Sequence, residues 1–377
     1  MHILILNSEY PPIGGGASNA SAHLAAQLVR LRQQVTVLTA AYKDSPRDET
    51  LDGVRILRLP GLRRRLDRST ATEQTIFMLS ASLLGLAKVR NLHPDVVLAF
   101  FGAPSGVAAW FWSHFLTLPY IVSLRGGDVP GFRPYDFARQ HRLLGPLLRR
   151  VWRRAGRVVA NSEGLRQLGA DFEPRVTIEV IPNGVNLDTF RSPQRAWDPP
   201  HLLFVGRIVY QKGLDHLITA MGELKDQPWR LDLVGDGPRV EKLKEQAAGL
   251  GIADKVHFLG WLGRAELPKA YQQANLFVYP SRHEGMPNAV LEAMASGLPV
   301  LATRIAGNEE LVTEETGLLV PPEDPAALQS ALKKLLSDAA LRQRVGGAAR
   351  RRVEEKYSWQ AATQAYLDLM RNIVKSR

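Results

Sequence analysis

The chain has 377 residues and a formal net charge of +11, with 45% apolar and 23% charged residues. This length suits two domains of roughly 180 residues each, and the near-average composition excludes a disordered chain. The absence of cysteine excludes disulfides, thiolate nucleophiles and cysteine-bound zinc. Since no apolar stretch reaches membrane-spanning length, we expect a soluble, cytoplasmic protein. A peripheral position at the inner face of the membrane stays open.

The first element is a short apolar strand, Ile3–Leu6, followed by a turn that contains Gly15 and Gly16 and by a helix from about Ser18, its expected N-cap. Glycines at such a turn let the backbone approach a ligand, and a helix N-terminus attracts anions. The dinucleotide-binding fingerprint is broken because Asn19 stands where it needs Gly or Ala. A purely structural turn and a phosphate-binding turn are equally compatible with this pattern.

Short apolar runs alternate with helical patterns along the rest of the chain, which is typical of parallel sheets built from βαβ units. We therefore expect an α/β protein with two doubly wound domains. The expected strands are Ile3–Leu6, Val35–Leu38, Arg55–Leu59, Val96–Phe100, Tyr120–Ser123, Val158–Ala160, Ile178–Ile181, Leu202–Val205, Arg230–Val234, Val256–Leu259, Leu276–Tyr279, Val300–Ala302 and Gly317–Val320.

The excess of positive charge lies in the first half, where residues 1–195 hold 25 Lys and Arg against 15 Asp and Glu. Some arginines of this half form two clusters. The second cluster is interleaved with apolar residues, as in a basic amphipathic helix that could face anionic lipid, a phosphate-bearing acceptor or nucleic acid. A solvated arginine-rich face is the equally weighted alternative. The clusters are Arg63, Arg64, Arg65 and Arg68, and Arg149, Arg150, Arg153, Arg154 and Arg157.

The segment Phe190–Pro200 has prolines, charges and no periodicity, so we expect it to link the domains. The predicted division is an N-terminal domain over 1–189, a linker over 190–200 and a C-terminal domain over 201–357. A last helix within 358–377 has apolar residues at helical spacing and is expected to pack back on the first domain.

The sharpest constellation is a pair of glutamates, Glu284 and Glu292, around a strand-to-helix turn that follows the strand Leu276–Tyr279. Open α/β sheets bind ligands at the carboxyl ends of their strands. The expected helix is Asn288–Ala295, whose first amides would point at an anion. Such a site suits a ligand that is anionic in one part and rich in hydroxyl groups in another, because ionised Glu accepts hydrogen bonds from hydroxyls. A nucleotide sugar is such a ligand.

Two cations follow the strand Leu202–Val205, namely Arg207 and, five residues later, Lys212. A guanidinium and an ammonium at one strand exit suit a diphosphate whose charge grows as its bond to a sugar breaks. Either cation alone would more simply be a solvated surface charge.

Together these features resemble glycosyltransferase family 4, glycosyl transferases group 1. The resemblance covers almost the whole chain and rests on Gly206-Arg207 with Lys212-Gly213, Val234 to Pro238, Phe258 to Gly260, Glu284 with Glu292, Pro182 to Val185, Gly297 to Val300 and Tyr357 to Trp359. It implies a GT-B fold, in which two Rossmann-like domains face each other across a cleft, the second binding the donor and the first the acceptor.

By this resemblance Arg207 and Lys212 hold the diphosphate, Glu292 holds the ribose, and Glu284 contacts the donor sugar and acts in catalysis. Backbone amides of the turn also assist at the sugar, namely those of Gly285, Met286, Asn288 and Ala289. Gly15 and Gly16 of the other domain close on the phosphates. The expected partners are a nucleotide-sugar donor, a glycan or lipid-linked acceptor and an anionic membrane surface, without nucleic acid and without any cofactor.

The family retains anomeric configuration, and its favoured mechanism is front-face attack in which the leaving phosphate takes the acceptor proton. The sequence contains no Asp-x-Asp, which agrees with a metal-free mechanism, so no metal-binding residues are expected. Arg125 stands where many relatives have His, and it cannot serve as a base. It would bind an anionic group, orient Asp128, or form a structural Arg–Asp pair.

Rival functions on this architecture are a sugar-nucleotide epimerase, a phosphorylase and a binding protein without catalysis. A phosphorylase would need a pyridoxal lysine and a longer chain, and a nicotinamide dehydrogenase is disfavoured by Asn19. The sugar, the nucleobase and the acceptor cannot be derived from one sequence.

Overall fold

The computed structural model describes residues 1–66, 69–132, 134–263 and 265–376, and Arg68 of the first basic cluster therefore lies outside the described residues. The chain forms two compact units. Unit 1 comprises Met1–Asn183 together with Trp359–Arg377, and unit 2 comprises Gly184–Ser358.

Unit 1 is built on an eight-stranded sheet in the order β3-β4-β2-β1-β5-β6-β7-β8. All neighbouring strands are parallel except β3 and β4, which are antiparallel. Three central strands are buried along their whole length, as expected for a parallel sheet covered on both faces. The strands are β1 (His2–Leu6), β2 (Gln34–Ala40), β3 (Asp48–Leu51), β4 (Val54–Leu59), β5 (Val96–Phe100), β6 (Tyr120–Leu124), β7 (Arg157–Ala160) and β8 (Ile178–Val180).

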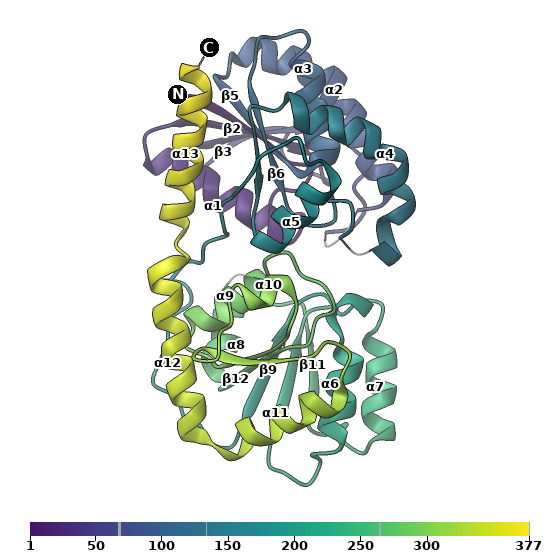
Figure 1. The fold of residues 1–377 in the computed structure, drawn as a ribbon, viewed down its shortest axis with the longest axis vertical. Helices are drawn as coiled ribbons and strands as arrows, with labels where there is room; N and C mark the ends of the chain where they lie inside the picture. The colour runs from purple at the N-terminus through teal and green to yellow at the C-terminus, as the bar shows by residue number, and fades with distance from the viewer. Residues whose placement is uncertain (67–68, 133, 264, 377) are drawn as a thin grey trace. The chain divides into compact units, whose positions relative to one another are not determined.

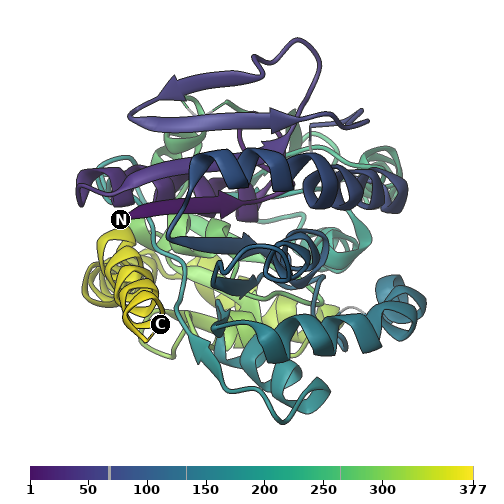
Figure 2. The ribbon, with the colours of Figure 1, turned by 90° about the horizontal axis from the view of Figure 1, so that it is seen from above.

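Helices cover both faces of this sheet. One face carries α1 and α13, which lie side by side (Figure 1), and the view from above shows α13 close to the N-terminus of the chain (Figure 2). The other face carries α2 to α5. The helices of unit 1 are α1 (Gly16–Arg30), α2 (Ala71–Leu92), the π-helical turn η1 (Phe101–Gly106), α3 (Val107–Trp112), α4 (Pro134–Arg154), α5 (Glu163–Phe172) and α13 (Trp359–Lys375).

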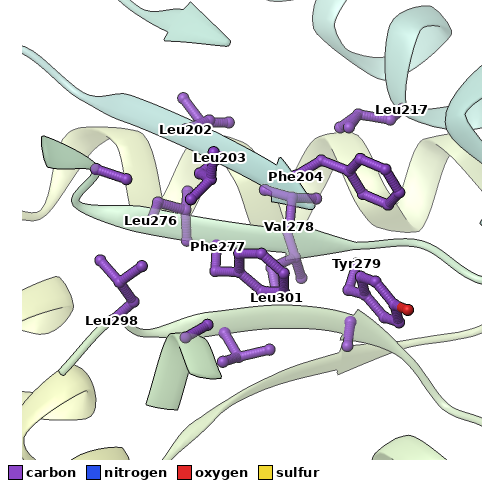
Figure 3. Close-up of a cluster of buried hydrophobic side chains, with 14 of the residues drawn as sticks. Leu202, Leu203, Phe204, Leu217, Leu276, Phe277, Val278, Tyr279, Leu298 and Leu301 are labelled. Carbon is purple, nitrogen blue, oxygen red and sulfur yellow. The ribbon is translucent and has the colours of Figure 1, made fainter. Parts of the chain in front are cut away.

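Unit 2 is built on a six-stranded, fully parallel sheet in the order β11-β10-β9-β12-β13-β14. Figure 3 shows its core, where Phe204, Phe277 and Tyr279 pack among leucine side chains of neighbouring strands. The strands are β9 (His201–Val205), β10 (Arg230–Val234), β11 (Val256–Gly260), β12 (Leu276–Tyr279), β13 (Val300–Thr303) and β14 (Gly317–Val320). The helices are η2 (Tyr210–Lys212), α6 (Leu214–Gly222), α7 (Val240–Gly249), α8 (Leu267–Gln273), α9 (Asn288–Ala295), α10 (Ala306–Glu309), α11 (Pro325–Ser337) and α12 (Ala339–Lys356).

The strand order of unit 2 reverses at β9. The chain passes from β9 to β10 on one side, and β12 later pairs with β9 on the other side. Loops that leave two such strands diverge, and the crevice between them is where open α/β sheets bind ligands. In unit 1 the same reversal occurs between β1 and β5. The exits of β9 and β12 therefore become the first place to look for a site.

The segment expected as a linker, Phe190–Pro200, belongs to unit 2 in the structure, and the boundary lies at residues 183 and 184. Arg195 donates hydrogen bonds to the backbone oxygens of Ala274 and Ser296. The amide group of Asn275 donates to the oxygen of Trp197 at 3.1 Å. The lack of periodicity correctly indicated irregular chain, but these distant buried partners hold it against the domain.

Candidate functional site

The exits of β9 and β12 touch through their backbones. Gly213 ends the loop after β9 with φ of +64°, and a Cβ on it would lie 2.1 Å from the carbonyl oxygen of Pro280 in the loop after β12. Only glycine combines this left-handed conformation with so close an approach. The contact brings together two segments almost 70 residues apart, and with them the side chains that the sequence singled out.

Lys212 and Glu284 form a buried ion pair at this contact. Lys212 Nζ lies 2.6 Å from Glu284 Oε1, and both side chains are about nine-tenths buried. Lys212 Nζ also donates to the hydroxyl of Tyr279 at 2.5 Å, and burial, followed by the charge of Glu284, raises the pKa of Tyr279 well above its ordinary value. The sequence predicted both residues for the site but did not pair them.

Arg207 lies two residues after the end of β9 and is half-buried. Within the described parts of the chain, no carboxylate lies at ion-pair distance from its guanidinium. Lys212 is neutralised by Glu284, whereas no described carboxylate pairs with the positive charge of Arg207. Arg207 therefore offers a positive charge at this exit of the sheet, which favours an anionic ligand.

Arg282 braces the two exit loops, and its importance was not foreseen from the sequence. It is buried, and its guanidinium donates to Asp215 of α6, to Glu323 at 2.7 Å and to the backbone oxygen of Tyr210 at 2.5 Å. Its backbone N–H donates to Gln211 O at 2.7 Å. These bonds fix the turn that carries Lys212 against the loop that carries Glu284. The sequence signal was an arginine two residues before that glutamate.

The helix α9 spans Asn288–Ala295, as the sequence predicted, and no side chain caps its N-terminus. Glu292 lies one turn inside the helix and accepts a hydrogen bond from the hydroxyl of Tyr271 at 2.8 Å. Burial raises the pKa of Glu292 to about 7, so its carboxyl group titrates near neutral pH. Gly285, Met286 and Ala289 occupy the turn and the first turn of the helix, between the two glutamates.

In unit 1, the Gly-rich turn leads into α1, which begins at Gly16 with Gly15 as its N-cap and without a side-chain cap. The prediction that Ser18 is the N-cap is wrong. Its hydroxyl lies inside the helix and donates to the oxygen of Ile13 at 2.6 Å, a local bond that competes with capping. A Cβ on Gly15 would meet no atom within 4 Å, so the backbone here borders open space.

Arg125 and Asp128 lie at the exit of β6 in unit 1 but do not form the ion pair considered from the sequence. The guanidinium of Arg125 donates to Asn183 Oδ1 at 2.8 Å and to the hydroxyl of Tyr366 at 3.3 Å. The Asp128 carboxylate instead accepts backbone N–H groups, that of Gly102 at 2.8 Å and that of Arg125 at 3.0 Å. Burial raises the pKa of Asp128 and lowers that of Arg125.

Across the described residues, no group of three or more histidine, aspartate or glutamate side chains is arranged to hold a metal ion. None of the described helices is both long and apolar enough to cross a bilayer.

Comparison with known proteins assigns both parts of the chain. Residues 187–352 match the family model of glycosyl transferases group 1, and residues 15–184 match that of the glycosyl transferase 4-like domain. The chain is 30% identical to a D-inositol 3-phosphate glycosyltransferase from Kineococcus radiotolerans, over 96% of this chain and 92% of the relative.

Solved structures show the same fold. A sucrose-phosphate synthase from Thermosynechococcus elongatus aligns with a TM-score of 0.89 at 24% identity over 100% of both chains. The Anabaena protein HepE, in a complex with UDP-glucose, aligns with a TM-score of 0.79 at 19% identity, again over 100% of both chains. The two Rossmann-like units thus have the GT-B architecture, and the chain belongs to the family of glycosyl transferases group 1.

Proposed function

We propose that the protein is a retaining, metal-independent glycosyltransferase that moves a sugar from a nucleoside diphosphate sugar to a glycan or lipid-linked acceptor. The observation that carries the proposal is the arrangement at the exits of β9 and β12. There Arg207, which pairs with no described carboxylate, stands on the same loop as Lys212, whose buried partner is Glu284. The family supports sugar transfer in general, and the structural relative with UDP-glucose supports this donor class.

The diphosphate is the part of the donor that this arrangement fits best. Arg207 supplies a guanidinium that pairs with no carboxylate among the described residues, and Lys212 supplies an ammonium that is already oriented by Glu284 and Tyr279. Cations held in place before the reaction stabilise the charge that grows on the leaving phosphate without reorganising. These cations neutralise the charge of the diphosphate, as a divalent ion does in other transferases. Gly15 and Gly16 at the start of α1 are a second proposed anion-binding element.

The remaining site residues fit the hydroxyl-rich parts of the donor. Glu292 is held by Tyr271 and would accept hydrogen bonds from the ribose hydroxyls. Glu284, with the turn from Gly285 to Ala289, would face the sugar, where its negative charge stabilises the positive charge that builds at the anomeric carbon. Arg125 and Asp128 would serve the acceptor or donor-sugar side.

The proposed reaction retains configuration by front-face attack. The bond from the anomeric carbon to the phosphate oxygen breaks, and the acceptor oxygen forms its bond on the same face. The acceptor proton passes to the leaving phosphate, so the reaction needs no separate base.

A donor panel tests the proposal. The purified protein is incubated with nucleoside diphosphate sugars and candidate acceptors, nucleoside diphosphate release is followed, and the anomeric configuration of the product is read by NMR. We expect release and transfer with one donor, retained configuration, and full activity in excess chelator. A product that is an isomerised nucleotide sugar would identify an epimerase. Binding without any turnover would identify a binding protein, and a strict Mg²⁺ requirement would exclude the metal-independent reaction.

Arg207→Ala and Lys212→Ala should each lower kcat by about 100-fold or more, as for the loss of a preorganised group aimed at developing charge. The measurement is turnover at saturating donor. Arg304→Ala, which removes an exposed cation of unit 2 whose weak ion pair with Glu309 spans 3.7 Å, is the control and should keep wild-type turnover. Near wild-type rates in either of the first two variants would show that the diphosphate binds elsewhere.

A further inference from the structure

A groove of about 430 Å³ lies on the surface of unit 1, outside the residues assigned above. It is bordered by the loop at 130–131, by α4 and by the end of α5 at Phe172. A Cβ on Gly145 would lie 3.6 Å from the Phe172 ring, which is ordinary van der Waals contact, so α4 passes close to Phe172 here. The side of the groove formed by α4 consists of Ala138, His141, Arg142, Gly145, Pro146 and Arg149.

The ionisable side chains that line this groove among the described residues are His141, Arg142 and Arg149, which are all basic. The guanidinium of Arg149 lies 4.4 Å from the centre of the Phe172 ring and 3.7 Å from Glu173, whose closer partner is Arg153 at 2.7 Å. Arg142 is exposed and, in the described part of the chain, has no ion-pair partner. The groove therefore offers positive charge above an aromatic floor.

Next to the groove, a second row of side chains on α4 combines two arginines with an exposed leucine. Arg139, Leu143 and Arg150 follow each other at spacings of four and seven residues, so they share one face of the helix. Leu143 is 81% exposed, and Phe115, just after the adjacent helix α3, is 63% exposed. Protruding apolar side chains among arginines are typical of surfaces that lie at the boundary of lipid headgroups and acyl chains.

The charge balance around this face has the same sign over a longer stretch. Residues 71–154, which run from the start of α2 to the end of α4, contain 10 Lys and Arg but only 4 Asp and Glu. A positive surface attracts the negative surface of a membrane with anionic lipids by about 1 kcal/mol for each nearby cation.

We propose that this groove, with its flanking row of side chains, binds the phosphate headgroup of an anionic phospholipid at a membrane surface. Arg142 and Arg149 would hold the phosphate over Phe172, and Leu143 would enter the acyl boundary. The exposed leucine matches hydrocarbon and has no counterpart in a nucleic-acid backbone. The inference does not depend on the proposed transfer reaction, because it concerns binding only.

Vesicle cosedimentation of the full chain tests this binding. Vesicles of phosphatidylcholine alone are compared with vesicles that also contain phosphatidylglycerol. We expect binding to the mixed vesicles only, weakening as salt is raised. Arg142→Glu with Arg149→Glu should lower the affinity about 20-fold or more, since each charge contributes about fivefold. Leu143→Ser should weaken binding without changing its salt dependence.

The matched control is Arg344→Glu with Arg351→Glu, two exposed arginines that are also seven residues apart on one helix, α12 of unit 2. It should bind like wild type. Arg142→Glu alone, at an exposed residue, covers the case in which the double variant does not fold. Equal binding to both vesicle types, or an equal loss in the control, would overturn the proposal. So would tight binding of inorganic phosphate, glycerol phosphate or a DNA duplex by a protein that ignores anionic vesicles.

Discussion

At the residue scale, the pairing of Lys212 with Glu284 gives the two site cations different structural roles. Lys212 is buried with its partner, whereas Arg207 is half-buried and unpaired among the described residues. Removing one member of a buried pair leaves the other charge uncompensated, which commonly costs about 3–5 kcal/mol. The ion pair is therefore part of the fold as well as of the proposed site.

We predict that Lys212→Met lowers the free energy of unfolding by about 3 kcal/mol, while Arg207→Met changes it by less than about 1 kcal/mol. Urea unfolding followed by circular dichroism measures both. Lys212→Met with Glu284→Gln should recover part of the loss, because no buried charge is then left without a partner. A Lys212→Met variant as stable as the wild type would mean that the pair contributes nothing to the fold.

The two glutamates are expected to differ in kinetics. Glu284→Gln should lower kcat with a smaller change in the donor KM, because Gln keeps the shape but removes the negative charge near the anomeric carbon. Glu292→Gln should mainly raise the donor KM, because its contact with ribose is the same in the ground state and the transition state. Steady-state kinetics separate the two cases. Unchanged kcat in both variants would reduce Glu284 to a binding residue.

The raised pKa of Glu292, about 7, predicts a pH dependence of donor binding. The carboxyl group is protonated below this pKa and ionised above it, and the ionised form accepts hydroxyl hydrogen bonds better. The affinity for a nucleoside diphosphate should therefore increase about tenfold between pH 6 and pH 8. The pKa of Glu292 is higher in the folded chain than in the unfolded chain, so its ionisation favours unfolding. The free energy of unfolding should therefore decrease as the pH rises from the ordinary pKa of a glutamate through 7.

Isothermal titration calorimetry at the two pH values checks this dependence. Glu292→Gln is the control, because it removes the titrating group and keeps an acceptor for the Tyr271 hydroxyl. A variant with the same pH dependence as wild type would assign the effect to the phosphate of the ligand.

At the element scale, Arg282 couples the loop after β12 to the loop after β9. Its contacts with Asp215, Glu323 and the backbone of Tyr210 fix the position of the turn that carries Lys212. The brace is a positioning device, because Arg282 acts on the proposed diphosphate site through these loops.

We predict that Arg282→Ala raises the donor KM and lowers the free energy of unfolding by about 2–4 kcal/mol, since it leaves the half-buried Asp215 without its main partner. Glu323→Gln is the matched control, because its side chain is 56% exposed and exposed pairs contribute about 1 kcal/mol or less. Kinetics and urea unfolding measure the two effects. If both variants behave alike, the brace does not position the site.

At the scale of the whole molecule, the chain returns to unit 1 after completing unit 2. Helix α13 buries Trp359, Tyr366 and Met370 against the face of the sheet that carries α1. The hydroxyl of Tyr366 also contacts Ser123 at 2.8 Å and Arg125 at 3.3 Å. Helix α13 is therefore part of the core that supports the exit of β6.

Met370→Ala should cost unit 1 about 2–5 kcal/mol, because it opens a cavity in this core. Gln360→Ala, at an exposed position of the same helix, should change stability by less than about 0.5 kcal/mol. Hydrogen exchange resolves the effect by unit, and the amides of β1 and α1 should lose protection. A uniform loss over both units would contradict the assignment of α13 to unit 1.

The sequence by itself determined the alternating α/β plan, the strands near their observed bounds and the helix α9. These features follow from local hydrophobic periodicity and turn chemistry, which neighbouring residues carry. It missed β3, an exposed antiparallel edge strand without an apolar pattern. Only the tertiary structure decided that Lys212 pairs with Glu284, that Arg282 joins two loops and that Phe190–Pro200 is held by unit 2. Those contacts join residues about 40 to 150 positions apart, and their energy depends on burial and geometry that no local pattern contains.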